Sequence, residues 1–379
     1  MPRRIFDNDE EIALQSEIQR ELDRKYKPIF DEHGPQGIPL KDLREEMLNT
    51  GITSHVPKRQ FDKMLAKANS NKDSYINYKE FVTLMAGEDA LLSRNKVKVS
   101  GVVEAAIVSI VPIRKQKDFL ANYTCCPPPV FMFLVTLAEI AVFVYYVLEL
   151  KKKDIEVTWS TGVPICSPLI YSPYDRKEAW RYISYMFIHQ GYLHLIFNCI
   201  FQIILGIPLE FVHKFWRLFL VYMLGVLAGS MAHSVTDRFS FLGGASGGCY
   251  ALIGAHLAAV IVNWKEMNYK CWDGSFLRML LSAPVRLIVI LTLVFTDTGS
   301  AIYRRYTTTG GTKVGISAHI GGMLAGLLLG VPVMKNINEL PWERTLGLVT
   351  AVIYVIFTMI AVLINILYHD YPDPNLNPC

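Results

Sequence analysis

Residues 315–330 read Gly-Ile-Ser-Ala-His-Ile-Gly-Gly-Met-Leu-Ala-Gly-Leu-Leu-Leu-Gly, an apolar stretch in which small residues recur at four-residue spacing. Residues four apart lie on one face of a helix, so Ala318, Gly322 and Gly326 form a smooth ridge. Small residues let the backbones of membrane helices approach closely, whereas lipid gives larger apolar side chains no reason to leave it. The stretch therefore predicts a membrane helix pressed tightly against a neighbour, with His319 near its start.

Six more apolar runs lie outside this stretch, and each is close to the ~20 residues that cross a bilayer. Several are rich in Gly and Ala, which again favours close helix packing. We therefore expect an all-α fold, a polytopic bundle of seven packed membrane helices rather than a single anchor. The seven expected spans are residues 130–150, 182–207, 216–233, 246–264, about 280–295, 314–333 and 346–368.

Charge is distributed unevenly along the chain. Of the 38 Lys and Arg and the 34 Asp and Glu, 17 and 18 respectively lie in the first 110 residues. The net charge of +4 and the absence of a basic block exclude nucleic-acid binding. The predicted organisation is a soluble head at 1–90, a juxtamembrane linker at 91–129, a membrane core at 130–335, and a seventh helix with a short tail at 336–379.

The head reads as two helix–loop–helix halves, and residues 69–80 fit the twelve-residue calcium loop of an EF-hand. The departures are Asn at position 1 and Ser74 in place of glycine at position 6, which both weaken the affinity. The other half, residues 31–42, has His33 and Pro35 where ligands belong, so we expect it to bind no calcium. An EF-hand fold used only for protein contact is the alternative. The predicted calcium ligands are Asn69, Asn71, Asp73, Tyr75, Asn77 and Glu80.

Polar side chains within the expected spans are candidates for function, because burying them unpaired in a membrane is expensive. In the second span, His194 and Asn198 lie four residues apart and so on one helix face. The fourth span opens with Ser246, flanked by Gly244 and Gly247, which permit close backbone approach.

These groups together permit acyl transfer by a serine. A serine becomes a nucleophile when a base takes its proton, and His319 can do so as a dyad rather than a triad. The tetrahedral oxyanion needs hydrogen-bond donors. The backbone N–H of Ser246 at a helix N-terminus is one, and the side chains of Asn198 and His194 are others.

The same residues resemble the rhomboid intramembrane serine proteases over about residues 130–335, and the resemblance implies a six-helix core. The EF-hand head and the seventh helix resemble the eukaryotic rhomboid-related proteins of the secretory pathway. The motifs are Trp180-Arg181, His194-xxx-Asn198, Gly244-Ala245-Ser246-Gly247 with Tyr250, and Ala318-His319-xx-Gly322-xxx-Gly326.

The resemblance implies an intramembrane serine endopeptidase with Ser246 as nucleophile and His319 as general base, the ring of Tyr250 stacking on that histidine. It implies that His194 and Asn198 complete the oxyanion hole, and that the Trp180-Arg181 loop is embedded in the membrane. The substrates would be single-span membrane proteins within the lipid bilayer, and catalysis would need no cofactor. The protein would reside in the secretory pathway or plasma membrane, with a cytosolic N-terminus and an active site opening toward the lumen or cell exterior.

Several features do not enter this prediction. Residues 297–300, Asp-Thr-Gly-Ser, spell the aspartic-protease signature, but that chemistry needs two aspartates and no second copy exists. His189 fits either the entrance of the site or helix packing. Cysteine spacing predicts no zinc site, and the pair Cys125-Cys126 fits either palmitoylation or unmodified thiols. For Glu139, Arg286, His233 and His256 we expect buried hydrogen bonds or positions at helix ends.

A non-catalytic membrane protein, which captures client helices and senses calcium, is the alternative function. The intact pair Ser246 and His319 favours the enzyme, because a protein that only binds has no need of both.

Overall fold

The computed structural model describes residues 23–24, 26–34, 37–39, 42, 73–82, 101–112, 116, 119–120, 123, 127–267, 282–307, 315–334 and 341–379. The chain divides into two compact units, Met1–Lys98 and Val99–Cys379. Cys125 and Cys126 lie outside the described residues.

The first unit contains helix α2 (Lys27–Glu32) and the two short antiparallel strands β1 (Ile38–Pro39) and β2 (Tyr75–Ile76). Ile38 pairs with Ile76, and each stands at position 8 of its predicted loop. The rings of Phe30 and Phe81, with centroids 5.0 Å apart, form a small buried core beneath the strands.

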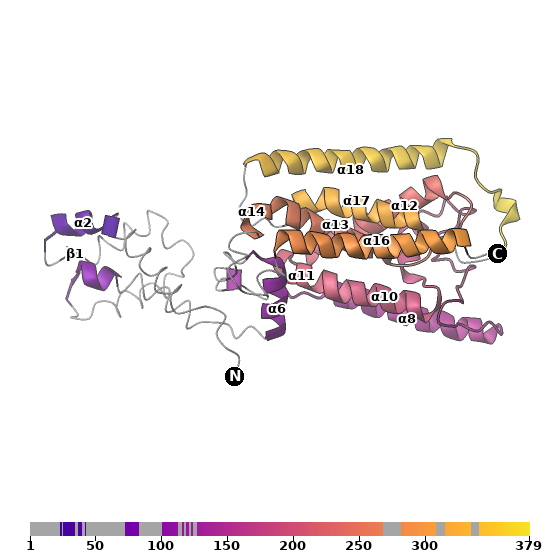
Figure 1. Ribbon diagram of the computed structural model, residues 1–379, viewed down its shortest axis with the longest axis horizontal. Coiled ribbons are helices and arrows are strands. Elements are labelled where there is room, and N and C mark those ends of the chain that lie inside the picture. Colours follow the sequence, from indigo (N-terminus) through magenta and orange to yellow (C-terminus); the bar gives the residue numbers. More distant parts are fainter. Residues whose placement is uncertain are drawn as a thin grey trace. The chain divides into compact units, whose positions relative to one another are not determined.

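The second unit is a bundle of apolar helices that run alongside one another (Figure 1). Among the described residues, six helices are long and apolar enough to cross a membrane, and Ser246–Val262 is a shorter apolar helix of 17 residues. A π-turn at Gln202–Gly206 joins α10 to α11, so that the pair forms one span. The spans are α8 (Phe131–Lys152), α10 (Gly191–Phe201) with α11 (Ile207–His213), α12 (Phe215–Thr236), α13 (Ser246–Val262), α16 (Ala283–Thr307), α17 (Ile316–Val333) and α18 (Pro341–Leu367).

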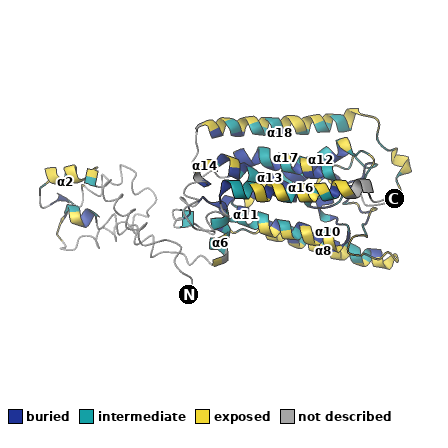
Figure 2. Cartoon of the chain, in the orientation of Figure 1, coloured by how far each residue is buried: buried dark blue, intermediate teal, exposed yellow. Residues whose placement is uncertain are grey.

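Helix α13 forms the centre of the bundle and packs against α12 and α17. A β-carbon on Gly322 would collide with the carbonyl oxygen of Gly247, and one on Gly326 with that of Ala251. The small-residue ridge therefore brings the backbones of α17 and α13 into direct contact, as the sequence predicts. Figure 2 shows the buried residues gathered in these inner helices, while much of α18 is exposed. The exposed apolar side chains of the outer helices suit a lipid environment.

Two buried carboxyl groups are held by hydrogen bonds inside the bundle. Glu210 of α11 accepts from the backbone N–H groups of Phe131 and Met132, at 2.7 and 2.9 Å, and so caps the N-terminus of α8. Gln202 donates to Glu139 at 2.7 Å. These bonds tie α8 to the second span, and they account for Glu139 as a buried hydrogen-bonded residue.

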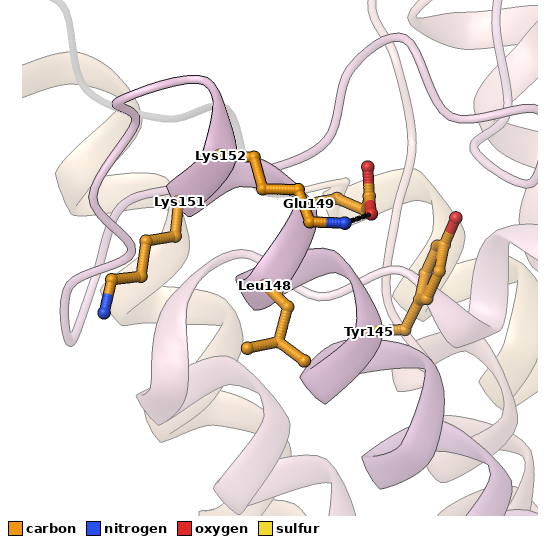
Figure 3. A pocket seen from close by; sticks show the side chains of 5 residues that line it. All are labelled: Tyr145, Leu148, Glu149, Lys151 and Lys152. Atoms are coloured by element: carbon orange, nitrogen blue, oxygen red, sulfur yellow. Dashed lines mark hydrogen bonds and ion pairs between the residues drawn. The ribbon is translucent and has the colours of Figure 1, made fainter.

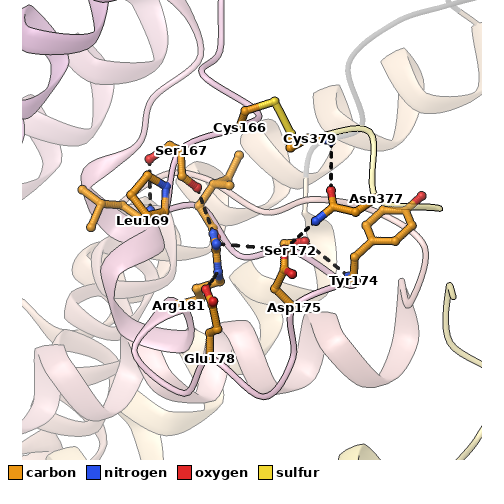
Figure 4. Close-up of polar contacts among 12 residues, drawn as sticks. Cys166, Ser167, Leu169, Ser172, Tyr174, Asp175, Glu178, Arg181, Asn377 and Cys379 are labelled. Atoms are coloured by element: carbon orange, nitrogen blue, oxygen red, sulfur yellow. Dashed lines mark hydrogen bonds and ion pairs between the residues drawn. A yellow bond between two sulfur atoms is a disulfide. The ribbon is translucent and has the colours of Figure 1, made fainter. Parts of the chain in front are cut away.

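The segment between α8 and α10 is fixed by polar contacts. Arg181, at the start of α9 (Arg181–Ser184), donates to the carbonyls of Ser167 and Ile170 at 2.8 and 2.9 Å. A disulfide joins Cys166 of this segment to Cys379 at the end of the chain (Figure 4). The sequence analysis assigned no partner to either cysteine, because their separation of 213 residues carries no pairing signal.

The disulfide also requires an even number of membrane crossings between its two cysteines. Cys166 follows the first span and Cys379 follows the last, so an even number of crossings must separate them. The six helical spans from α10 to α18 meet this condition only if α13 crosses the membrane in spite of its 17 residues. Counted over the described helices, seven crossings agree with the number expected from the sequence.

Two predicted limits of membrane spans need correction. The second span begins at Gly191 rather than at residue 182. Gly191 has φ +68°, a non-helical conformation that separates α10 from the short helix η1 (Tyr185–Phe187) before it. The fifth span continues to Thr307, well beyond the expected end at 295. Its polar side chains are satisfied locally, as Thr296 and Ser300 donate to carbonyls of their own helix. Part of the expected linker, α6 (Gly101–Ile110), packs on α11, and its Ile107 is fully buried.

Candidate active site

Ser246 and His319 lie within hydrogen-bond distance of each other. Ser246 is the first residue of α13, and His319 lies in the first turn of α17. Nε2 of His319 is 3.0 Å from Oγ of Ser246. Because α13 and α17 are in backbone contact at Gly247 and Gly322, the two side chains meet across the closest part of the helix pair. This is the distance that proton transfer from a serine to a histidine requires.

Tyr250 stacks on the imidazole of His319, with ring centroids 4.3 Å apart and planes inclined by 17°. Its phenol donates to Oδ2 of Asp297 at 2.6 Å. The same Oδ2 is 3.4 Å from Nδ1 of His319. Asp297 belongs to α16, so a third helix reaches the site; the sequence analysis gave this aspartate no role. An acidic residue within an apolar span is a signal that could have marked it.

His194 is packed against Gly244, two residues before the serine. Gly244 has φ +126°, and a β-carbon there would lie 2.7 Å from Nε2 of His194. The backbone N–H of Gln190 donates to Nδ1 of the same ring at 3.4 Å, which leaves the hydrogen on Nε2. The structure thus directs an N–H group of His194 toward the segment that carries Ser246.

Asn198 lies one turn further along α10 and is 4% exposed. Its Nδ2 donates one hydrogen to the carbonyl of His194 at 2.7 Å, and its Oδ1 accepts from Cys249 at 3.4 Å. A carboxamide nitrogen has two hydrogens, so one remains for another acceptor. The backbone N–H of Ser246 is in the first turn of α13, where a helix offers no internal partner.

The segment before the serine is held by further buried contacts. Tyr171 and Leu242 exchange two backbone hydrogen bonds, at 3.0 and 3.1 Å. Burial, and next the neighbouring His194, lower the pKa of His189 well below its usual value, so the ring stays neutral. Its Nε2 accepts from the backbone N–H of Ala245 at 3.4 Å. His189 therefore holds the residue directly before Ser246. Of the two roles that the sequence allowed for His189, the entrance of the site or packing, this contact favours packing.

Ser246 begins a helix that is shorter than the span before it. Helix α13 has 17 residues, whereas α12 has 22. At ~1.5 Å per residue the difference is about 8 Å of helix length. The segment 237–245 lies on the same side of the bundle as Cys166 and Cys379, because α10 with α11 and then α12 cross the membrane twice after Cys166. Ser246, the residue after this segment, therefore lies toward the side that carries the disulfide.

Other polar residues within the spans make hydrogen bonds to backbone carbonyl groups. Nε2 of His256 bonds the carbonyl of Leu205 at 3.0 Å, and Nε2 of His233 bonds that of Ser240 at 3.2 Å. Arg286 donates to the carbonyl of Ile110 at 3.5 Å. These contacts agree with the structural role expected for these residues.

A pocket at the C-terminal end of α8 contains none of the predicted catalytic residues (Figure 3). Lys152 and Glu149 form an ion pair of 2.6 Å there. The other residues that line it are Tyr145, Leu148 and Lys151.

Only part of the predicted calcium loop falls in the described chain, because Asn69 and Asn71 lie outside the described residues. Oδ1 of Asp73 accepts from the N–H of Tyr75 at 2.8 Å. Glu80 and Asn77 accept from each other's backbone N–H groups at 3.2 and 3.0 Å, a capping box at the start of the following helical turn. The described half supplies oxygen atoms of the hard type that calcium prefers.

The family model and the similar proteins found by comparison all point to one family. The Rhomboid domain family matches residues 176–336. The chain is 42% identical over 258 residues to rhomboid-related protein 2 of Mus musculus, covering 68% of this chain and 81% of that protein. It is 32% identical over 377 residues to rhomboid-related protein 3 of Homo sapiens, covering 93% and 90%. It is also 35% identical over 210 residues to inactive rhomboid-related protein 2 of Caenorhabditis elegans, covering 55% of each. The chain is therefore a multi-pass membrane protein that belongs to the rhomboid family.

Proposed function

We propose that this chain is an intramembrane serine endoprotease that cleaves the transmembrane segments of single-span membrane proteins. The observation that carries the proposal is the 3.0 Å separation of Ser246 Oγ and His319 Nε2 at the start of two closely packed helices. The stacked ring of Tyr250 restricts the imidazole to one plane, which favours a single orientation toward the serine.

The proposed reaction begins when Oγ of Ser246 attacks a peptide carbonyl of the substrate while Nε2 of His319 takes the hydroxyl proton. The oxyanion that forms is stabilised by the N–H of Ser246, the second Nδ2 hydrogen of Asn198 and the Nε2 hydrogen of His194. His319 then gives its proton to the leaving amine, and an acyl-enzyme remains. Water, activated by the same histidine, releases the second product. No step needs a cofactor.

The substrate must be locally unwound, because a regular helix keeps its carbonyls in internal hydrogen bonds. We expect cleavage near Gly, Pro or polar residues, which make unwinding less costly. In a confirmed substrate, replacing these residues by Leu should slow cleavage. Unchanged cleavage would place recognition elsewhere in the substrate.

The proposed orientation puts the N-terminus in the cytosol. Disulfides persist in oxidising compartments, which supports a lumenal or extracellular position for Cys166 and Cys379. An odd number of spans then leaves residues before α8 in the cytosol, within the secretory pathway or plasma membrane. The active site would open away from the cytosol. For the head we propose one calcium ion in the loop 69–80, supported by the paired strands at Ile38 and Ile76.

A non-catalytic binding protein is the second candidate, and the relative named inactive favours it. The deciding experiment co-expresses the chain with a panel of single-span membrane proteins and compares wild type with Ser246→Ala, His319→Ala and the double variant. We expect each single change to abolish cleavage and the double variant to be no worse, because the two residues act as one unit. Turnover that persists in a folded Ser246→Ala protein would remove the protease proposal.

A further inference from the structure

Asp297 is an ionisable residue on α16 that the proposed dyad does not use. Its Oδ2 is 3.4 Å from Nδ1 of His319 and accepts the phenol hydrogen bond of Tyr250 at 2.6 Å. Nδ1 of His319 is buried and has no hydrogen-bond partner in the described part of the chain, and the carboxylate of Asp297 at 3.4 Å is an acceptor within reach of it. The carboxylate thus stands on the side of the imidazole opposite the serine.

The two ring nitrogens of His319 have different tasks. Nε2 must be free of its hydrogen to take the proton of Ser246, so the resting hydrogen must lie on Nδ1. An acceptor beside Nδ1 favours this tautomer, and a negative acceptor also stabilises the imidazolium that forms during the reaction. Ser246 and Tyr250 from α13 and Asp297 from α16 lie against the ring.

We propose that Asp297 is a positioning residue for His319, a negative acceptor supplied by α16 beside the dyad of Ser246 and His319. The inference rests on the proposed function and leaves Ser246 and His319 as the reacting pair. No atom is transferred to the aspartate: it accepts the Nδ1 hydrogen and keeps its charge throughout.

The placement on α16 links activity to the docking of that helix. Only 6% of its most apolar window is buried, so most of α16 faces away from the bundle. Near the site, its polar contacts to α13 are those of Asp297 and Thr298 with the phenol of Tyr250, at 2.6 and 3.3 Å. A movement of α16 away from α13 would remove the acceptor from His319 while leaving Ser246 and His319 in place.

Asp297→Asn separates a positioning role from a merely structural one. The carboxamide oxygen can still accept from Tyr250, so the contact between α16 and α13 is kept, whereas the charge beside Nδ1 is lost. We expect kcat of the purified full-length protein, with a confirmed single-span substrate, to fall ~10-fold to ~100-fold, less than the ~10⁴-fold loss for a buried triad aspartate, because Asp297 is half exposed. KM should change less than ~2-fold, since the substrate does not touch this side of the ring. Asp297→Glu should recover part of kcat. The rate at which a fluorophosphonate probe labels Ser246 should fall in parallel in Asp297→Asn.

Thr296→Val is the matched control, because its hydroxyl bonds only a carbonyl of its own helix, that of Thr292 at 2.7 Å. It should keep wild-type kcat. If Asp297→Asn keeps more than half of wild-type kcat while Asp297→Ala loses activity, the aspartate only holds α16 and the proposal is overturned. If both variants keep full activity while Ser246→Ala has none, the positioning role of Asp297 is overturned and the serine protease stands. Activity that survives in Ser246→Ala would overturn both.

Discussion

Gly322→Ala tests the contact that brings Ser246 and His319 together. A β-carbon on Gly322 would overlap the carbonyl oxygen of Gly247 and stand 2.9 Å from its carbonyl carbon. Carbon atoms in contact prefer ~3.5–4.0 Å, so α17 must move away from α13 by about 1 Å. His319 lies three residues earlier on the same helix and would move with it. The distance from its Nε2 to Oγ of Ser246, now 3.0 Å, would reach about 4 Å and the hydrogen bond would be lost.

A misplacement of this size costs ~100-fold in rate. Overpacking of the helix contact should also lower the free energy of unfolding by ~1–3 kcal/mol. We expect kcat for a single-span substrate to fall about 100-fold in the purified Gly322→Ala protein, with a lower melting temperature in detergent. Gly299→Ala in α16 is the control, because a β-carbon there meets no atom within 4 Å. Wild-type kcat in folded Gly322→Ala would show that the backbones of α13 and α17 are not in contact at this point, and would refute the reasoning.

Three more predictions concern other parts of the molecule. Asn198→Ala should lower kcat ~10-fold to ~1000-fold with the protein still folded, as one oxyanion donor disappears, and complete loss as in Ser246→Ala would mean another role. Cys379→Ser should make Cys166 reactive to a maleimide added outside intact cells, whereas in wild type the label should appear only after reduction; labelling of unreduced wild type would contradict the disulfide. Glu80→Gln should abolish binding of one calcium ion of ~10⁻⁵ M affinity, measured by calorimetry on the full chain. If wild type takes up no calcium at millimolar concentration, the head serves protein contact alone.

The membrane bundle and the residues of the candidate site could be predicted from the sequence, because both depend on the spacing of residues along single helices. A run of ~20 apolar residues can satisfy its backbone in lipid only as a helix, so the spans follow from composition. The four-residue period of Ala318, Gly322 and Gly326 places them on one face, and the same rule places His194 above Asn198. Such periodicities are properties of a single helix.

The ends of two spans were wrong because helix limits depend on contacts outside the helix. Gly191 begins α10 at φ +68° in a position where a β-carbon would stand 2.8 Å from the carbonyl oxygens of Thr158 and Trp159. That close approach involves a loop more than thirty residues away. Helix α16 continues past Asp297, and the carboxylate of this residue accepts a hydrogen bond from Tyr250 of another helix. A hydropathy pattern contains neither partner.

The aspartate beside His319 and the disulfide of Cys166 with Cys379 belong to the tertiary structure alone. Asp297 lies 22 positions before His319, a spacing that has no meaning along a single helix, and the two meet only because α16 and α17 both pack beside α13. The two cysteines meet because six spans between them return the chain to the same side of the membrane. Spacing along one helix reveals which side chains share a face, but the distance between two faces is decided by how the helices pack.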